Sequence, residues 1–464
     1  MSYEPNRESV SRHPVPTWYQ DAKFGIFIHW GLYSVPAWAP IAGDPMQIIS
    51  QHGWLYFFRN NPYAEWYQNS LRIEHSPTRL YHTIRHGVNF DYSDFAPLFR
   101  EACRHWDPNE WADLFASVGA RYVVFTAKHH DGFLLWPSSY PNPHRPDYRS
   151  ERDLVGELAR AVSTRGLRLG LYYSSGLDWT FNDRTILDIS DIPQAIPDDE
   201  VYRTYVKRHW MELIDRYEPA ILWSDIAYPP SGNVNELFAY YYNRIPDGVV
   251  NDRFNQSFEF TTAGLVKDNH YDFQTFEYLT PTDIIEHKWE MTRGFGYSFG
   301  YNRNEGPEHY LSTEQLVHLL VDVVSKNGNL LLNVGPMADG TIPPKQRERL
   351  LELGRWLQRY GEAIFATRPW VRFGSVTEDG VEVRFTTKES SLYVILLGSP
   401  HGCQVRLRGF LAAPNTSIVL LPSAQPLTFS QEADSVVIQI PSSQEHEPAY
   451  VLKVTPMLES LRTQ

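Results

Sequence analysis

Two acidic residues lie at the ends of strand-like segments, where they could act together as a nucleophile and an acid. Asp225 ends the apolar run at residues 220–225, and Glu277 lies near the end of residues 272–278. Hydrolysis of a glycosidic bond needs such a pair, because one carboxylate attacks the anomeric carbon while the other carboxyl group protonates the leaving oxygen. Asp is also a common turn opener, so a structural role for Asp225 is the alternative.

Three histidines occupy similar positions and offer a second kind of chemistry. His29, His129 and His130 follow predicted strands, and with Asp225 they could hold a metal ion. Metal-dependent barrel hydrolases use His-x-His or His-x-x-x-His spacing, which this set lacks. Neutral imidazole offers one donor and one acceptor, so we favour hydrogen bonding to sugar hydroxyls and predict no metal and no other cofactor. A core role for one of the two adjacent histidines is the alternative.

Aromatic residues are abundant near these polar positions. They make up 14% of the chain, with 14 Trp and 28 Tyr. Flat aromatic faces suit either a large core or a surface that stacks on a sugar ring, and core packing is the alternative for each of them. The candidates for sugar contact are Trp30, Trp66, Trp223, Tyr228 and Phe299.

The elements that must position these residues alternate between strands and helices. Strands are expected at residues 23–31, 122–132, 167–175, 220–225, 249–254, 272–278 and 329–336. Helices are expected from the capping residue Asp107 to Gly119 and at residues 153–165, 201–217, 236–244, 312–325 and 344–359. Repeated strand and helix units over residues 1–366 predict an α/β fold with a parallel sheet.

We favour a (β/α)8-like, TIM-type barrel over a doubly wound sheet. In a barrel, reacting groups lie at the carboxyl ends of several different strands. The polar residues of this chain fall at such ends on several predicted strands, namely His29, His129, His130, Asp225, Arg253 and Glu277.

The remaining 367–464 segment has a different pattern. Short alternating runs separated by turns predict a small C-terminal antiparallel β-sandwich domain. Two domains also agree with the length, because 464 residues exceed what one hydrophobic core usually organises.

Charge and cysteine content exclude several classes of protein. The net charge of -13 argues against a nucleic-acid partner, which would need a basic face. Only Cys103 and Cys403 occur, so no disulfide framework is expected. The first 16 residues are polar, and no apolar run approaches 18 residues, so we expect no secretory signal and no membrane partner. A cytoplasmic location is expected, and assembly into a homo-oligomer is compatible with the sequence.

Several motifs together resemble one enzyme family. The segments KFGIFIHWGLYSVPAW, NPYAEWY, AKHHDGF, LGLYYSSGLDW, LWSD, VNDR and FGYNRNE occur in this order. As a set they are similar to the glycoside hydrolase family 29 α-L-fucosidases of the bacterial type, over about residues 18–367. The sandwich is also similar to that family's C-terminal domain. The resemblance implies a retaining, exo-acting hydrolase that cleaves terminal α-L-fucosyl linkages of glycans or glycosides through a covalent fucosyl-aspartyl intermediate, without metal or organic cofactor.

The resemblance also implies roles for individual residues. Asp225 would be the nucleophile and Glu277 the acid/base, with Glu65 and Glu290 as alternatives for the second role. Tyr172 and Arg253 would lie beside the nucleophile and keep it ionised. The remaining substrate contacts would be His29, Glu65, His129 and His130 to hydroxyl groups, and Phe27, Tyr63 and Phe299 to the fucose methyl group, with core packing as the alternative for these three.

Three positions depart from the family pattern and bear on leaving-group specificity. Ile226 stands where Gly often follows the nucleophile, while Tyr228 and Phe254 stand where Trp is common. Two other classes of function remain as alternatives. One is a sugar-binding protein without catalysis, which an assay with an aryl fucoside would distinguish, and the other is a metal-dependent barrel hydrolase, which a chelator would inhibit.

Overall fold

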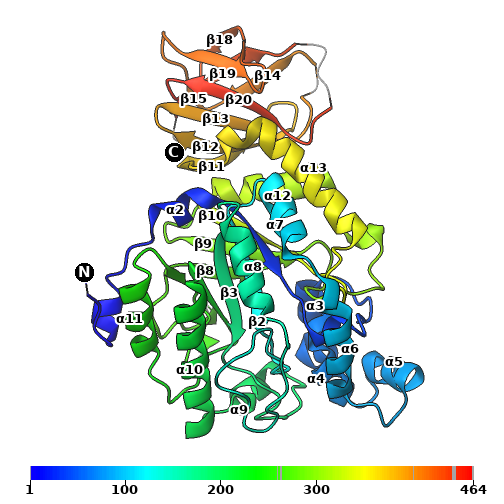
Figure 1. Cartoon of the computed structure of the whole chain (residues 1–464). Helices are drawn as coiled ribbons and strands as arrows, with labels where there is room; N and C mark the ends of the chain where they lie inside the picture. Colours follow the sequence, from blue (N-terminus) through cyan, green and yellow to red (C-terminus); the bar gives the residue numbers. More distant parts are fainter. Residues whose placement is uncertain (1, 259, 262–263, 401, 442–445, 462–464) are drawn as a thin grey trace.

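A parallel-stranded barrel wrapped by helices forms the larger part of the chain, and antiparallel sheets are stacked on one end of it (Figure 1). The computed structural model describes residues 2–258, 260–261, 264–400, 402–441 and 446–461. The predicted combination of a (β/α)8-like barrel and a C-terminal antiparallel β-sandwich is confirmed. The division into domains at residues 366 and 367 stays a prediction.

Eight parallel strands form the barrel sheet in the order β5-β4-β3-β2-β1-β10-β9-β8. Its two edges meet at an isolated parallel bridge between Asn251 and Phe273, which brings β5 next to β8. The strands are β1 (Phe24–Ile28), β2 (Tyr122–Lys128), β3 (Arg168–Ser174), β4 (Ile221–Asp225), β5 (Val249–Val250), β8 (Gln274–Glu277), β9 (Trp289–Gly294) and β10 (Gly328–Val334).

Helices cover the outside of the barrel, and the two predicted capping residues, Asp107 and Ser312, are confirmed at the starts of their helices. Asp107, Asp153, Asp199 and Ser312 each accept a hydrogen bond from a backbone N–H in the first turn of their helix. The helices are α1 (Arg7–Val10), α2 (Thr17–Ala22), α3 (Pro45–Arg59), α4 (Tyr67–Arg72), α5 (Pro77–His86), α6 (Phe95–Ala102), α7 (Pro108–Ser117), α8 (Leu154–Ser163), α9 (Ile192–Ala195), α10 (Glu200–Tyr217), α11 (Val234–Arg244), α12 (Thr313–Ser325) and α13 (Pro344–Tyr360).

The barrel is irregular on one side. Within the described residues, β5 and β8 are joined by the short hairpin of β6 (Phe260–Thr261) and β7 (Gly264–Leu265) and not by a helix. The connection from β8 to β9 also lacks a helix. Strand β9 was not predicted from the sequence, because its segment WEMTRG mixes apolar and charged residues without a clear alternation.

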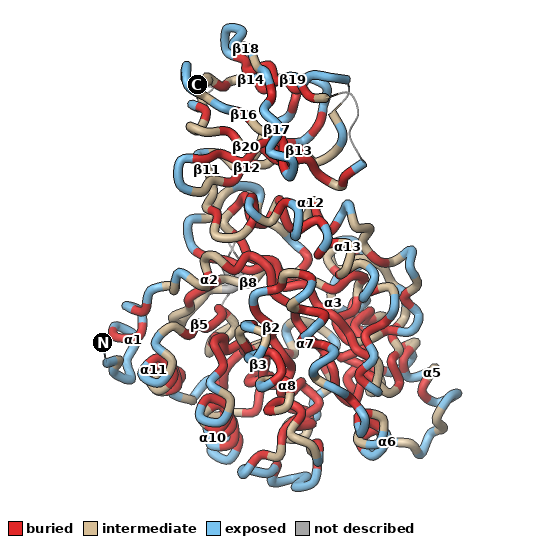
Figure 2. Tube along the Cα trace, turned by 45° about the horizontal axis from the view of Figure 1, so that its top comes forward, coloured by how far each residue is buried: buried red, intermediate tan, exposed pale blue. Residues whose placement is uncertain are grey.

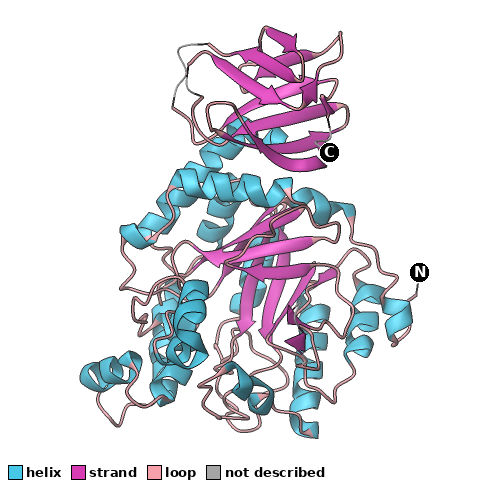
Figure 3. Cartoon of the chain, turned by 180° about the vertical axis from the view of Figure 1, so that it is seen from behind, coloured by secondary structure: helices cyan, strands magenta, loops and turns pink. Residues whose placement is uncertain are grey.

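The C-terminal part consists mainly of two antiparallel sheets with an apolar core between them (Figure 3). One sheet holds β11 (Arg368–Val376), β12 (Glu382–Lys388), β13 (Ser391–Leu396), β20 (Tyr450–Thr455), β16 (Ser417–Leu420) and β17 (Gln425–Pro426). The other holds β14 (Gln404–Arg408), β19 (Ser435–Gln439) and β18 (Phe429–Glu432). A short pair, β15 (Phe410–Leu411) and β21 (Glu459–Ser460), lies beside them.

The sandwich packs against the end of the barrel where the strands begin. Arg368 forms an ion pair with Asp21, which directly precedes the first barrel strand, and Arg384 pairs with Asp322 on α12. Buried residues fill both the barrel and the sandwich (Figure 2). The opposite end of the barrel, where the strands finish, therefore stays free of the sandwich. None of the helices among the described residues combines the length and apolar character that crossing a bilayer would need.

Candidate active site

A cavity of about 420 Å³ opens where the barrel strands end. Its size is within the usual range for a small-molecule site. All but one of the residues predicted to act in catalysis or to bind the sugar directly line it, apart from two aromatic candidates described below; they are Phe27, His29, Tyr63, Glu65, Trp66, His129, Tyr172, Trp223, Asp225, Arg253, Glu277 and Phe299. The exception is His130, which is fully buried and whose Nε2 lies 3.8 Å from Oδ2 of Asp225.

Asp225, the last residue of β4, is surrounded by hydrogen-bond donors. Its Oδ2 accepts from the hydroxyl of Tyr172 at 2.9 Å, and its Oδ1 accepts from Nη1 of Arg253 at 2.8 Å and from the backbone N–H of Ile226 at 2.8 Å. Burial acts to raise the pKa of Asp225, but attraction to Arg253 and these hydrogen bonds outweigh it, so its pKa lies below the usual value. Asp225 is therefore ionised at neutral pH.

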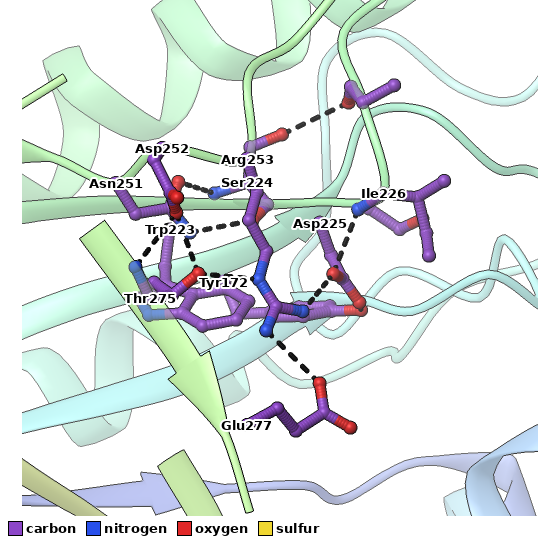
Figure 4. A network of polar contacts seen from close by, with 12 residues as sticks. Tyr172, Trp223, Ser224, Asp225, Ile226, Asn251, Asp252, Arg253, Thr275 and Glu277 are labelled. Carbon is purple, nitrogen blue, oxygen red and sulfur yellow. Dashed lines mark hydrogen bonds and ion pairs between the residues drawn. The ribbon is translucent and has the colours of Figure 1, made fainter. Parts of the chain in front are cut away.

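Glu277, the last residue of β8, shares the same guanidinium. Nη2 of Arg253 donates to Oε2 of Glu277 at 3.1 Å, so one Arg253 side chain contacts both carboxylates (Figure 4). The hydroxyl of Tyr63 donates to Oε1 of Glu277 at 2.8 Å. Tyr63 was predicted to contact the sugar methyl group, and the structure adds this hydrogen bond to the carboxylate.

Arg253 is itself fixed by residues that the sequence did not indicate. Its Nε donates to Oγ1 of Thr275 at 2.8 Å, and that hydroxyl donates to Oδ1 of Asp252 at 2.7 Å. The guanidinium lies 4.8 Å from the ring centre of Trp223, which stacks on Tyr172. The VNDR segment carries both Asp252 and Arg253, but only the folded sheet shows that Thr275 lies between them.

The histidines at the cavity are neutral at physiological pH. Burial lowers the pKa of His29 to about 4 and that of His130 to about 3, and it also lowers the pKa of His129. Nδ1 of His29 lies 2.7 Å from Oδ1 of Asn333, whose amide nitrogen donates to the carbonyl of Phe299. His29 therefore donates through Nδ1, which leaves Nε2 as an acceptor.

His130 also donates a hydrogen bond through its Nδ1. Nδ1 of His130 lies 2.6 Å from Oγ of Ser174, which donates its own proton to the carbonyl of Leu177.

Among the described residues, the side chains close enough to share a metal ion are His13, His270 and Asp272, which lie outside the cavity. Both nitrogens of His13 are already within hydrogen-bond distance of Asp272 and the carbonyl of Pro246.

Glu65 is the other carboxyl group that lines the cavity, and it differs from Asp225. Burial raises its pKa to about 8, although the backbone N–H of Gly300 donates to its Oε2 at 2.7 Å. Ser298 is also within hydrogen-bond distance of this oxygen, at 3.4 Å. Glu65 is consequently protonated at neutral pH and can donate a hydrogen bond.

Glu290, the other alternative for the acid/base, does not line the cavity. It lies inside the barrel on β9 and accepts hydrogen bonds from Tyr19, Tyr122 and Trp223. Trp30 and Tyr228, two of the aromatic residues considered for sugar contact, also lie outside the cavity lining. Both are buried in the core, which agrees with the packing alternative.

An apolar rim around the cavity was not predicted. These partly buried residues are Met46, Ile49, Trp54, Ile189, Ile226 and Phe258. The aromatic-rich insertion after β1 and the unusual Ile226 were the only signals in the sequence.

Comparisons with known proteins agree with this geometry. A family model described as Alpha-L-fucosidase matches residues 1–362, and a model of the Alpha-L-fucosidase C-terminal domain matches residues 377–455. Tissue alpha-L-fucosidase of Rattus norvegicus is 35% identical over 98% of this chain and 92% of its own length. A crystal structure of Thermotoga maritima alpha-fucosidase with a mechanism-based inhibitor is 47% identical, with a TM-score of 0.86, and covers 98% of this chain and 100% of that one. A crystal structure of Thermotoga maritima alpha-fucosidase in complex with fucose has the same identity of 47%, the same TM-score of 0.86 and the same coverage of both chains.

Proposed function

This chain belongs to the α-L-fucosidase family of glycoside hydrolases, and from that membership we propose that it removes terminal α-L-fucosyl units by a retaining, double-displacement mechanism. The observation that carries this proposal is the single guanidinium of Arg253, which contacts two carboxylates on different strands at the barrel mouth. Retaining glycosidases need two carboxyl groups that face one sugar from a short distance.

In the first step, Asp225 attacks the anomeric carbon and forms a fucosyl ester, while the bond to the leaving oxygen breaks. Glu277 gives its proton to that oxygen. In the second step, Glu277 takes a proton from water, the water oxygen attacks the anomeric carbon, and Asp225 leaves as a carboxylate. Arg253 and Tyr172 support the first step because their hydrogen bonds keep Asp225 ionised.

The remaining cavity residues suit recognition of one deoxyhexose. Neutral His29 and His129 can each donate and accept, as a ring of hydroxyl groups requires. Phe27 and Phe299 form an apolar corner for the methyl group of fucose, with ring centres 6.4 Å apart. Trp66 and Trp223 add flat faces along the cavity wall. The substrate class is thus a fucosylated oligosaccharide, glycoconjugate or glycoside.

Replacing the proposed acid/base tests the mechanism directly. In Glu277→Ala, kcat/KM for fucosides with poor leaving groups should fall by about 10²- to 10⁴-fold, the usual contribution of general acid catalysis. Activated aryl fucosides should suffer less, and azide should restore turnover by replacing the missing base. Asp225→Gly should abolish hydrolysis of both kinds of substrate.

Glu65→Ala is the matched control, because Glu65 is the other cavity carboxyl group that can hold a proton. If azide rescues Glu65→Ala and not Glu277→Ala, the assignment of the acid/base is wrong. A labelled residue other than Asp225 after treatment with a 2-fluoro fucosyl inhibitor would contradict the proposed nucleophile.

We also propose that the protein works in the reducing environment of the cytoplasm. Its two cysteines are unpaired, with Cys103 buried and Cys403 exposed, which suits that compartment. Fractionation of cells that express the native protein, followed by an assay with an aryl fucoside, tests this proposal.

A further inference from the structure

We propose that the outer half of the cavity is an apolar leaving-group site that favours alkyl or aromatic aglycones over a second sugar. This inference rests on the proposed fucosidase function and concerns the part of the cavity beyond the two carboxylates. It is built from Ile226, which departs from the family motif, and from four residues that no sequence motif indicated, namely Met46, Ile49, Trp54 and Phe258.

One wall comes from α3, in the insertion after β1. Met46, Ile49 and Trp54 line the cavity and are only partly buried, so they present apolar surface to its interior. Phe57 and Phe58 anchor the end of this helix. Their rings pack against Tyr63 and Trp66, at centroid distances of 5.8 and 5.6 Å. The apolar wall is therefore continuous with the residues proposed to hold fucose.

Ile226 supplies apolar surface directly beside the nucleophile. It follows Asp225 in the chain, lines the cavity and has a φ of +64°. A β-branched residue is strained in this left-handed region, where Gly would adopt the same backbone without cost. Strain of this kind persists where the surrounding structure holds it, often at functional sites. The backbone N–H of Ile226 donates to Asp225, and we infer that its side chain shapes the leaving-group side of the cavity (Figure 4).

The polar groups near this rim already have partners in the protein. Nζ of Lys267 pairs with Asp252 at 2.9 Å, and the amide nitrogen of Asn255 donates to the carbonyl of Val266 at 3.0 Å. Thr275 is occupied by Arg253 and Asp252. A second sugar would lose hydrogen bonds to water on entering without gaining equivalent ones from these described residues, whereas an apolar aglycone loses none.

Alkyl fucosides of different length provide the test, because their leaving groups have similar basicity. The wild-type enzyme should show a kcat/KM for hexyl α-L-fucoside about tenfold or more above that for methyl α-L-fucoside, since burial of several methylene groups favours the longer chain. Hexyl fucoside should also exceed fucosyl-α-1,2-galactose. Equal values for the two alkyl fucosides, or a clear preference for the disaccharide, would overturn the inference.

Substitutions on α3 test whether its apolar side chains cause the preference for the longer alkyl fucoside. Met46→Gln and Ile49→Asn replace apolar surface with polar groups of similar size, so each should reduce the hexyl-to-methyl ratio by about tenfold. Leu55→Gln is the matched control, because Leu55 follows the kink at Gly53 in the same α3 segment, is 53% exposed and does not line the cavity. If Leu55→Gln lowers the ratio as much as Met46→Gln, the inference fails.

Fucosyl fluoride separates this inference from the proposed function. Its leaving group is a single atom that cannot reach the apolar rim, so Met46→Gln and Ile49→Asn should hydrolyse it within about twofold of the wild-type rate. Failure of the wild-type enzyme to hydrolyse fucosyl fluoride would contradict the proposed fucosidase function. Hydrolysis of the fluoride without a chain-length preference would contradict only the apolar leaving-group site.

Discussion

At the scale of single residues, Arg253 keeps Asp225 ionised in a small cavity that holds two other carboxyl groups, Glu277 and Glu65. Two neighbouring carboxylates without a cation would repel, and one of them would keep its proton. The guanidinium contacts both Asp225 and Glu277, and the net effect is a lowered pKa for Asp225 in spite of its burial. Among the described residues, Glu65 accepts hydrogen bonds from no cationic side chain, and burial raises its pKa to about 8. The cavity thus combines an ionised nucleophile with a carboxyl group that retains its proton.

The protonation of Glu65 predicts a loss of activity in alkaline solution. Below pH 8 the protonated carboxyl group can donate a hydrogen bond to a sugar oxygen. Above it, ionised Glu65 loses that donor and places a negative charge near Glu277. We therefore expect kcat/KM to fall as the pH rises through about 8. In Glu65→Gln, whose amide still donates but does not ionise, kcat/KM at pH 6 should stay within about tenfold of wild type and this alkaline fall should disappear.

The measurement is kcat/KM for an aryl fucoside between pH 5 and 10 for both proteins. An unchanged alkaline limb in Glu65→Gln would show that another group causes it. The folded-state pKa of Glu65 is raised, so its contribution to stability is complete below its unfolded pKa of about 4.5 and is lost as the pH rises through 8. Unfolding followed by circular dichroism at pH 5 and 9 separates this loss of stability from the loss of catalysis.

At the scale of secondary structure, the sequence predicted the elements whose signals are local. The capping residues Asp107 and Ser312 marked helix starts, and apolar runs ending in polar residues marked the strands that carry His29, His129 and Asp225. Strand β9 lacked such a signal. Its Glu290 can lie inside the barrel because its carboxylate accepts hydrogen bonds from three side chains of other elements. A pattern of neighbouring residues in the sequence does not reveal such distant partners.

The same limit applied to the candidate site. Asp225, Glu277 and the histidines were predicted because they lie at or just after strand ends, where parallel-barrel geometry brings them together. Glu65 and Phe299 lie outside the strands and were predicted from the family resemblance. Thr275 and Asn333 were missed because their importance comes from contacts with Arg253 and His29, which are distant in the sequence. The apolar rim was missed for a different reason. The position of α3 depends on how a long insertion packs across the barrel mouth, which no periodic pattern specifies.

The contacts of Glu290 predict a link between β9 and the nucleophile. Trp223 donates to Glu290 and supports Arg253 and Tyr172, both of which contact Asp225. In Glu290→Ala, the buried donors of Tyr19, Tyr122 and Trp223 lose their acceptor, so the free energy of unfolding should fall by about 3 kcal/mol. The value of kcat should fall with it, because Trp223 becomes less constrained.

Glu290→Gln is the conservative comparison, since its amide oxygen retains one acceptor in the same volume. It should lose about half as much stability, and kcat should recover in part. Urea unfolding and kcat for an aryl fucoside measure the two effects. If Glu290→Ala unfolds at the wild-type urea concentration, or if it loses stability with an unchanged kcat, the proposed link is wrong.

At the scale of the whole molecule, the hydrophobic cluster of the barrel extends onto one face of the sandwich, whose interior forms a separate cluster. Tyr393 and Val451 of the sandwich belong to the same buried cluster as the barrel helices. Nε1 of Trp356 on α13 donates to the carbonyl of Ala449 at 3.1 Å, and the ring is almost fully buried. This interface lies at the end of the barrel opposite the cavity, so it should affect activity only through stability.

Trp356→Ala tests whether the two parts unfold together. Removal of this ring should lower the free energy of unfolding by about 3 to 5 kcal/mol, whereas Trp356→Phe, which keeps most of the buried surface, should cost clearly less. Because the interface between the two parts is buried and belongs to the barrel cluster, we expect one transition in urea, with fucosidase activity and circular dichroism lost at the same concentration. The value of kcat in the absence of urea should be unchanged, since Trp356 contacts no residue of the cavity lining. Two separate transitions, with activity surviving the first, would mean that the barrel folds independently and that the sandwich contributes nothing to the geometry of the site.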